Sequence, residues 1–409
     1  MKKLPLALLI VIAFAARALA DDKITLPPGF VYEDLYLGHG MTAIDFDPAG
    51  NLYVCEKMGR VLLFQPKGHD FKDPIVLLDL KGKVFFQREC GLMGIAIDPE
   101  FNSNHFFYLF YTTQTDQKLV RYTFDPATNT AAGETVLLSG LPRTHDEHKS
   151  GDIHFRPTEP GNIYITAGND TLPEAAVDDV NLYNGKLLRV NKADGKGLPD
   201  NPFYDKNLDS VASRVWALGL RNPFRFTFAP SGLPADYAYC SENGDQIDRF
   251  YQIKKGANGG WNHGRDQGLI NPPDPNVHIL GTHKPSMTGI AIAESGPFAG
   301  PNGEPVLYEE HWWLAQPGIL RGVLGGANRD TWTPIPSDPG GFFAPNLNCV
   351  NLKFGPDGAL YTTNTFFGAA DRNDFHLGRV KFVGVQDATP APASAPSATP
   401  AASPSPAAK

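Results

Sequence analysis

Residues 44–54 read IDFDPAGNLYV: an apolar alternating run, a proline, a glycine-containing turn, and a second apolar run that carries a tyrosine. Alternation of apolar and polar residues is typical of a half-buried strand, and a short Pro/Gly segment between two such runs indicates an antiparallel pair. The phrase returns at 95–111, 153–166, 226–239 and 352–363. A looser sixth copy consists of GIAIAESGPF at 289–298 and the run PVLYEEHWWLAQ at 305–316.

The spacing of these copies decides the fold class. They begin roughly 50–75 residues apart, which is typical of strand pairs repeated as propeller blades. The sequence therefore predicts an all-β protein with the architecture of a six-bladed β-propeller. In such a ring the ends of all the inner hairpins converge on one axial pocket, so residues far apart in the sequence can form one site.

The two ends of the chain differ from this pattern. Residues 1–20 resemble a secretory signal, because Lys2 and Lys3 precede an apolar run from Leu4 to Ala16, and Ala18-Leu19-Ala20 then provides an A-x-A cleavage site. We expect cleavage after Ala20, an exported protein (periplasmic or secreted), and no transmembrane segment after cleavage. The propeller is expected over residues 24–386, followed by a disordered tail over 387–409 that consists mostly of Ala, Pro, Ser and Thr.

Charge and cysteine content narrow the possible partners. The signal contains three of the 36 Lys and Arg residues, so the chain without it has 33 basic and 44 acidic residues. This acidic balance argues against a nucleic-acid partner. The cysteines are Cys55, Cys90, Cys240 and Cys349. An oxidising compartment permits disulfides but the sequence does not choose a pairing; the propeller arrangement would bring Cys55 and Cys90 onto neighbouring blades.

A geometric rule selects candidate site residues. In an antiparallel pair, the residues just before the first strand and just after the second lie at the same end of the sheet. Loops held by rigid sheets at such an end commonly carry binding chemistry. The rule gathers polar residues from three of the strand pairs at one end of the propeller: Glu89, His148, Arg221, Asn222 and the segment 242–245.

Each candidate has a functional and a structural interpretation. His148 has a titration range suited to a general base, and Glu147 could orient it; a solvated loop histidine is the alternative. Arg221 suits a ligand carboxylate, whereas a salt bridge between blades is the alternative. The segment 241–248, SENGDQID, offers oxygens that favour calcium but does not fit the EF-hand spacing, so a plain polar turn is equally consistent.

The motifs together resemble the soluble quinoprotein glucose dehydrogenase, aldose sugar dehydrogenase and sorbosone dehydrogenase family. The segments that carry the resemblance occur in the family's order over roughly residues 40–365. They are GLMGIAIDPEFNSNHFFYLFYT, EHKSGDIHF, NGKLLRVNKADGKGLPDNPF, WALGLRNPFRFTFAP, KKGANGGWN and NLKFGPDGALYTTN. The resemblance implies a propeller that binds pyrroloquinoline quinone (PQQ) through Ca²⁺ and oxidises a sugar or aldehyde by hydride transfer. An external quinone or cytochrome would then accept the electrons.

The resemblance also implies residue roles. His148 matches the family's general base, Glu147 matches the acid beside it, and Glu89 matches a polar residue near quinone and substrate. Arg221 and Asn222 match the pair that contacts the cofactor. Gly244 and Asp245 match the positions whose backbone carbonyls hold the calcium ion.

The chain departs from the family pattern where further cations are expected. Residues 346–350, NLNCV, contain no arginine, although the family places arginines just before this strand. The family's lysine in the preceding blade has no evident match, and Arg321 is the nearest substitute as a cofactor-binding residue. Unpaired quinone carboxylates would be costly to bury. We therefore expect weaker quinone binding, compensation from Arg88, Arg143 or Arg321, or no quinone.

Two other function classes fit the same features. The first is a non-catalytic carbohydrate- or protein-binding propeller, because a fold does not fix a function. The second is a calcium-dependent lactonase-type hydrolase, in which side chains would surround a central metal: Glu89, Glu147, Asn222 and Asn348.

Overall fold

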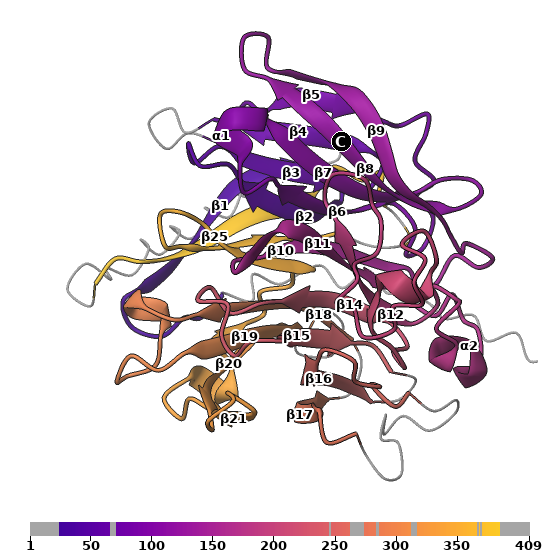
Figure 1. Ribbon diagram of the computed structural model, residues 1–409. Coiled ribbons are helices and arrows are strands. Elements are labelled where there is room, and N and C mark those ends of the chain that lie inside the picture. The colour runs from indigo at the N-terminus through magenta and orange to yellow at the C-terminus, as the bar shows by residue number, and fades with distance from the viewer. Residues whose placement is uncertain are drawn as a thin grey trace, which may run out of the picture.

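The computed structural model describes residues 24–65, 71–244, 247–261, 274–283, 286–311, 317–365, 368 and 370–384. The expected signal and tail, residues 1–20 and 387–409, lie outside these ranges. Among the described residues, six antiparallel sheets account for nearly all of the regular structure (Figure 1). The all-β, six-bladed propeller predicted from the repeats is confirmed. Each copy of the repeated phrase forms the two innermost strands of one blade, because its alternating runs can bury one side against the next blade.

The first three blades follow the order of the chain, each from its innermost strand outward. Blade 1 contains β2 (Met41–Phe46), β3 (Leu52–Glu56), β4 (Arg60–Phe64) and β5 (Ile75–Asp79). Blade 2 contains β6 (Leu92–Ile97), β7 (Phe106–Thr112), β8 (Gln117–Asp125) and β9 (Thr130–Leu141). Blade 3 contains β10 (Ser150–Arg156), β11 (Glu159–Ala167), β12 (Lys186–Asn191) and β13 (Val215–Ala217).

The remaining blades close the ring. Blade 4 contains β14 (Pro223–Thr227), β15 (Tyr237–Glu242), β16 (Asp248–Lys254) and β17 (Val277–His283). Blade 5 contains β18 (Met287–Ala293), β19 (Val306–His311), β20 (Gly318–Gly325), β21 (Thr331–Pro334) and β22 (Ala344–Pro345). Blade 6 contains β23 (Asn351–Phe354), β24 (Leu360–Thr363), β25 (Phe375–Phe382) and, as its outermost strand, β1 (Phe30–Gly38). Pairing of β1 with β25 joins the two ends of the described chain in one sheet.

Short helices occupy some of the connections. The α-helices found in the described part of the chain are α1 (Phe101–Asn104) and α2 (Glu174–Asp178), and 3₁₀ turns span Ala212–Arg214, Gly296–Phe298 and Pro339–Gly341. In the described residues no helix is long and apolar enough to cross a membrane.

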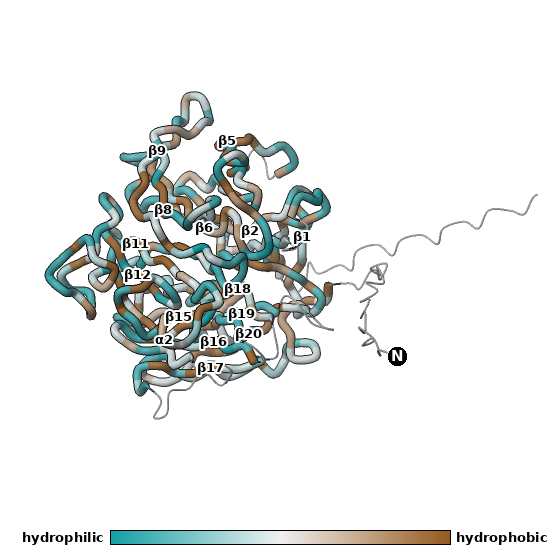
Figure 2. Tube along the Cα trace, turned by 90° about the vertical axis from the view of Figure 1, so that its right-hand side faces the viewer, coloured by the Kyte–Doolittle hydropathy of each residue, from teal (hydrophilic) through white to brown (hydrophobic). Residues whose placement is uncertain are grey.

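The innermost strands β2, β6, β10, β14, β18 and β23 pack consecutively around a common axis. In Figure 2 the inner strands lie near the middle of the ring, and β5, β9 and β17 lie at its margin. The hydrophobic core fills the spaces between adjacent blades: one cluster joins blades 1 and 2, and another joins blades 2 and 3. This rigid ring fixes the positions of the loops at both ends.

Arg225 of β14 occupies the axis itself. Its guanidinium donates to the carbonyl oxygens of Thr42 (2.6 Å), Met93 (2.9 Å) and Val350 (3.3 Å), and to the Asp152 carboxylate (3.1 Å). These partners belong to four other blades, and both charged residues are buried. One side chain therefore ties five blades together below the loops that carry the candidate site.

Candidate active site

The site face is the end of the propeller where the innermost strands begin, and we define it by Glu89, His148 and Asn222. These residues lie just before β6, just before β10 and just before β14, as the strand-end rule predicted. Hydrogen bonds join the loops that carry them across three blades. Glu89 accepts from the Asn222 amide (3.0 Å) and from the Lys149 backbone (3.2 Å), and Asn222 Oδ1 accepts from the Ser150 hydroxyl (2.9 Å).

His148 is oriented by Asn169, which follows β11. Their Nδ1 and Oδ1 atoms lie 2.7 Å apart. Asn169 Nδ2 donates to the carbonyl of Leu172 at 2.7 Å, and its Oδ1 also accepts from the Thr171 backbone. The amide orientation is thereby fixed with oxygen toward the imidazole, so His148 Nδ1 carries the proton. In the neutral ring, Nε2 is then the basic nitrogen.

The backbone around this pair adopts an unusual conformation. His148 and Ser150 have φ values of 55° and 53°, and Asp170 and Thr171 have 54° and 59°. Each such residue costs about 1–3 kcal/mol and persists only where its surroundings enforce it. Gly168 permits the close approach of the two segments, because a Cβ there would lie 2.0 Å from the His148 carbonyl oxygen.

An ion pair between Lys149 and Asp170 anchors the same loop, and both side chains are buried. Asp170 also accepts from the backbone amides of Thr144 (2.8 Å) and His145 (3.1 Å). Burial alone would raise the pKa of Asp170, but the hydrogen bonds from Lys149 and Thr144 hold it below its usual range. The loop that presents His148 is thus fixed by a carboxylate that stays ionised.

Glu147 does not orient His148, in contrast to the sequence-based expectation. Its carboxylate pairs with Arg88, and both side chains are well exposed. Neighbours along a connecting loop need not point in the same direction, and the orienting group comes instead from Asn169 at the end of the adjacent hairpin. Sequence reasoning missed Asn169, although the strand-end rule applied to 153–166 reaches the residues just after β11.

Arg221 and Asn222 lie next to Asn169 at the entrance to β14. Asn169 donates its backbone N–H to the Arg221 carbonyl at 2.7 Å. Arg221 is 8% exposed and Asn222 is 1% exposed. Arg221 Nη1 donates to the Asn243 carbonyl at 2.8 Å, so the guanidinium lies against the start of the segment 243–248.

The segment 243–248 is closed by the buried carboxylate of Asp248. Asp248 accepts from the backbone N–H of Gly244 (2.9 Å) and of Met287 (2.6 Å), and from the Asn243 amide (2.8 Å). Burial outweighs these bonds and raises the pKa of Asp248 to about 6. Gly244 directly follows the residue that Arg221 contacts, whereas Asp245 falls outside the described residues.

Arg321 does not join this group. Its guanidinium forms a two-fold contact with Asp338 at 2.7 and 2.9 Å and lies over the ring of Phe343. The other two cations considered as substitutes, Arg88 and Arg143, pair with Glu147 and Asp146. All three therefore serve intramolecular ion pairs. The sequence alone does not show which carboxylates the fold brings beside these cations.

Lys57 is a cation of the site face that sequence reasoning missed. It follows β3 directly, is fully buried, and donates from Nζ to the carbonyl oxygen of Arg88. Burial lowers the pKa of Lys57 to about 8, and the nearby Cys90 and Glu89 oppose this shift. The strand-end rule again identifies this position, since Lys57 is the first residue after the second strand of the repeat at 44–54.

The cysteines form no disulfide. All four are buried as thiols, and the pairing of Cys55 with Cys90 considered from the sequence is not present. Cys55 packs in the core between blades 1 and 2, whereas Cys90 faces Asp146.

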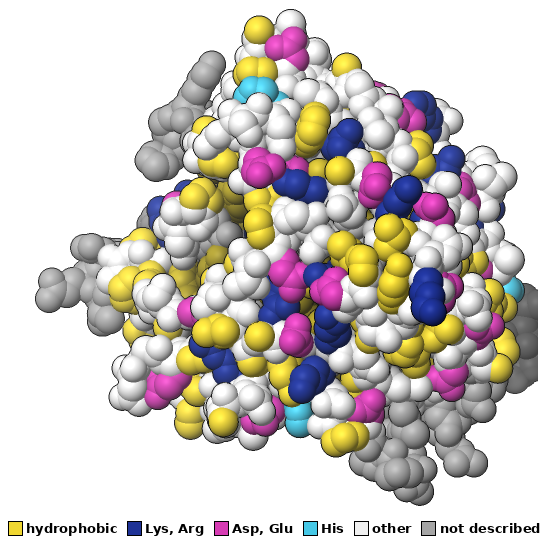
Figure 3. All heavy atoms as spheres, viewed as in Figure 1, with side chains coloured by type: hydrophobic (Ala, Val, Ile, Leu, Met, Phe, Trp, Pro, Cys, Tyr) yellow, Lys and Arg dark blue, Asp and Glu magenta, His cyan; other side chains and the backbone are white. Residues whose placement is uncertain are grey.

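The surface is mixed in charge: Figure 3 shows acidic and basic side chains intermingled over one side of the molecule.

Comparison with known proteins identifies the family. A family model described as glucose / sorbosone dehydrogenase matches residues 39–269, more than half of the chain. The chain belongs to the glucose/sorbosone dehydrogenase family. The match includes Glu89, His148, Asn169 and the Arg221–Asn222 pair.

Curated relatives support the assignment. Quinoprotein glucose dehydrogenase B of Acinetobacter calcoaceticus is 29% identical over 252 residues, which cover 54% of this chain and 49% of that protein. Hedgehog-interacting protein of Homo sapiens is 27% identical over 209 residues, covering 44% of this chain and 28% of that protein. The chain thus spans about half the length, or less, of these two relatives.

Solved structures extend the likeness to the whole propeller. A putative oxidoreductase (glucose dehydrogenase) from Thermus thermophilus is 25% identical, with a TM-score of 0.69, covering 86% of this chain and 100% of that one. The PQQ-bound aldose sugar dehydrogenase of Streptomyces coelicolor shares the fold at 20% identity, with a TM-score of 0.66, covering 87% of this chain and 99% of that one.

Proposed function

We propose that this member of the glucose/sorbosone dehydrogenase family is a PQQ-dependent dehydrogenase that oxidises an aldose, or a related aldehyde or polyol, to a lactone or acid. The observation that carries the proposal is the 2.7 Å contact between His148 and Asn169, which makes Nε2 the basic nitrogen of an imidazole at the site face. The family match and the similarity to a quinoprotein glucose dehydrogenase support the same reaction class.

His148 acts as the general base in this proposal. Its Nε2 takes the proton from the hydroxyl group of the carbon that is oxidised, which is the anomeric hydroxyl of a cyclic aldose or a hydroxyl of a hydrated aldehyde. Asn169 keeps the ring in the tautomer that this step needs and stabilises the imidazolium through the retained Nδ1–H bond. In this proposal Glu89, which accepts hydrogen bonds from Asn222 and Lys149, also accepts one from another substrate hydroxyl.

The donor set at the site face fits a quinone that carries several carboxylates. Arg221 and Lys57 are buried cations that donate to backbone carbonyls, and Asn222 lies beside Arg221. A ligand carboxylate would stabilise the ammonium of Lys57, whose pKa is lowered by burial. We assign PQQ binding to Arg221, Asn222 and Lys57. Bound PQQ would supply the electrophilic carbon that accepts the hydride.

The proposal includes a calcium ion, which would bind to the segment that starts at Asn243. The carbonyl oxygens of Gly244 and Asp245 are the proposed ligands, and oxygen ligands of this kind suit Ca²⁺. The Asp248 side chain, which closes this segment, provides the rigid support. Export through the signal over residues 1–20 and an external quinone or cytochrome as electron acceptor complete the proposed function.

Reconstitution tests this function. The purified protein, loaded with Ca²⁺ and PQQ, is assayed for dye reduction with a panel of aldoses and aldehydes. We expect turnover that requires both additions and that falls by about 10²–10⁴-fold in His148→Ala. His105→Ala is the matched control, because His105 has a similar φ of 56° but lies between β6 and β7 at the opposite end of the propeller.

A binding function is the second candidate. The similarity to Hedgehog-interacting protein and the absence of cations in residues 346–350 favour it. In that case the protein gives no dye reduction and no change in quinone absorbance on mixing. For the lactonase-type alternative, one of the four named ligands, Glu147, pairs with Arg88, while two others, Glu89 and Asn222, are joined by a hydrogen bond. That alternative predicts that the protein opens lactones with metal alone.

A further inference from the structure

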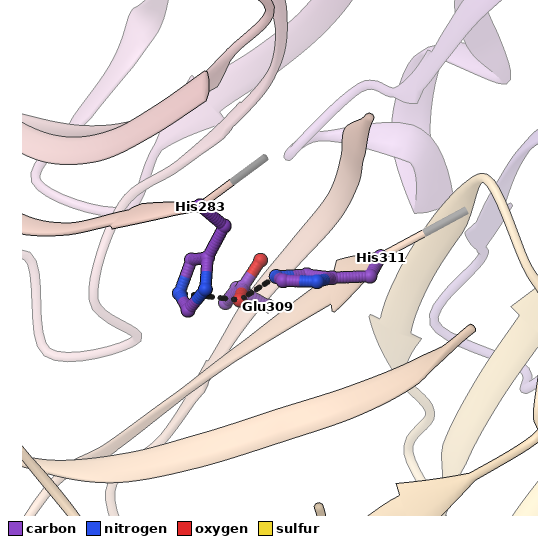
Figure 4. Close-up of side chains that lie close together, drawn as sticks. All are labelled: His283, Glu309 and His311. Atoms are coloured by element: carbon purple, nitrogen blue, oxygen red, sulfur yellow. Dashed lines mark hydrogen bonds and ion pairs between the residues drawn. The ribbon is translucent and has the colours of Figure 1, made fainter. Parts of the chain in front are cut away.

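His283, Glu309 and His311 converge at the junction of blades 4 and 5, outside the group around His148. Glu309 and His311 are two residues apart on β19, so their side chains point to the same side of the sheet. His283 is the last residue of β17 in the neighbouring blade. Figure 4 shows the Glu309 carboxylate between the two imidazoles, with both rings directed at it.

The three side chains are close enough to share one ligand. Glu309 Oε1 lies 2.7 Å from His311 Nε2 and 3.5 Å from His283 Nε2. One donor atom from each residue lies within 4.8 Å of the others. Two ligands at about 2.1 Å from a tetrahedral ion lie about 3.4 Å apart, so small side-chain rotations would complete the geometry.

Burial makes this cluster unusual for a simple histidine–carboxylate contact. The Glu309 side chain is 0% exposed, His311 is 6% exposed and His283 is 26% exposed. Glu309 Oε2 is buried and has no hydrogen-bond partner among the described residues. A buried carboxylate oxygen without a partner calls for an explanation, and a bound cation is one that also accounts for the two imidazoles.

We propose that His283, Glu309 and His311 bind a divalent transition-metal ion. Two imidazoles and one carboxylate suit Zn²⁺ or a similar borderline ion, whereas Ca²⁺ and Mg²⁺ prefer all-oxygen sites. Three protein ligands leave at least one coordination position for water or a substrate oxygen. The partly exposed His283 marks the side of the cluster that solvent reaches.

The proposed metal site borders the quinone site without depending on it. Asp248 and His283 are paired neighbours on the adjacent strands β16 and β17. The Asp248 carboxylate also accepts a hydrogen bond from Asn243, the residue that Arg221 contacts. The metal site would exist in either a dehydrogenase or a binding protein. Its test therefore measures metal binding rather than turnover.

The experiment uses untagged full-length protein that has been stripped with a chelator. Zn²⁺ is titrated by calorimetry, and Co²⁺ by visible absorption, which reports coordination number. We expect one equivalent to bind, with the dissociation constant raised at least about 100-fold in His283→Ala and in Glu309→Gln. His278→Ala is the matched control, since His278 is a half-buried histidine of the same strand outside the cluster.

The variants are checked for folding by circular dichroism before titration. His311→Gln is a second variant that retains a polar side chain of similar reach, so that the test survives if one alanine variant unfolds. Zn²⁺ should also raise the melting temperature of the wild type and of His278→Ala but not of the cluster variants. Absence of stoichiometric binding to the wild type, or equal affinity in all folded variants, overturns the proposal.

Discussion

Nδ1 of His148 donates to Oδ1 of Asn169 at 2.7 Å, and this contact sets which nitrogen of the imidazole is basic. Replacing the amide by a carboxylate in Asn169→Asp keeps the hydrogen bond but adds a negative charge beside the ring. An adjacent carboxylate raises the pKa of an imidazole. Because the base must be unprotonated, we expect the rising limb of kcat/KM to move to higher pH.

The companion variant Asn169→Ala removes the orienting bond altogether. We expect a fall in kcat of at least about 10-fold with little change in quinone affinity, because the base remains but loses its fixed tautomer. A pH–rate profile of Asn169→Asp that coincides with that of the wild type would show that Asn169 does not act through His148.

Arg221 is expected to hold the quinone rather than to move protons. Arg221→Ala removes the guanidinium that lies against Asn243, and PQQ affinity should fall by about 10–100-fold because a charge-assisted bond is worth about 1.5–3 kcal/mol. The dissociation constant is measured by absorbance titration. Arg321→Ala, which breaks a pair with Asp338 away from the site, should leave the affinity for PQQ unchanged in protein that is still folded.

The buried ammonium of Lys57 should make the free energy of unfolding depend on pH. Its pKa is lowered to about 8 in the folded protein against an ordinary value of 10.5. Between these values the unfolded chain binds more protons, so the free energy of unfolding should rise with pH over this window, by about 3 kcal/mol in total.

The measurement is urea denaturation of the wild type and of Lys57→Met at several pH values from 7 to 11. The difference between the two curves isolates Lys57 from the tyrosines that titrate in the same range. We expect the wild type to gain stability relative to the variant as the pH rises. If the free energies of unfolding of the wild type and of Lys57→Met differ by the same amount at every pH from 7 to 11, the pKa of Lys57 is not lowered by folding, and this prediction is contradicted.

We expect the free energy of unfolding of the propeller to depend strongly on Arg225. Arg225→Met removes bonds to four blades and leaves the buried carboxylate of Asp152 with His154, 3.0 Å away, as its remaining side-chain partner, which should cost about 3–5 kcal/mol of unfolding free energy. Arg225→Met combined with Asp152→Asn should recover part of this loss. Chemical denaturation of the single and double variants checks the coupling.

The repeated phrase was enough to predict the ring, because an alternating run buries one side in any such sheet. The segment 95–111 shows the limit of this inference: it forms β6 and β7 as expected, but its polar centre folds into the short helix α1. The strand-end rule brought Glu89 and Asn222 to one place, where a hydrogen bond joins them.

Other parts of the site depended on contacts that no local pattern encodes. The position of Glu147 next to His148 in the sequence allows it to orient the imidazole, yet Arg88 from the loop before β6 pairs with its carboxylate. The cluster of His283, Glu309 and His311 combines an outer strand of blade 4 with a strand of blade 5. Because tertiary packing sets the register of that outer strand, no sequence spacing could reveal the cluster.

Anaerobic mixing of an aldose with PQQ-loaded protein, followed by absorbance of the quinone, tests the proposed role of His148 without the later electron acceptor. We predict that the wild type converts the oxidised spectrum to the reduced one in a single turnover. His148→Ala should bind PQQ with similar affinity and show no conversion on the same time scale. Conversion at equal rates in both proteins would contradict the assignment of His148 as the base.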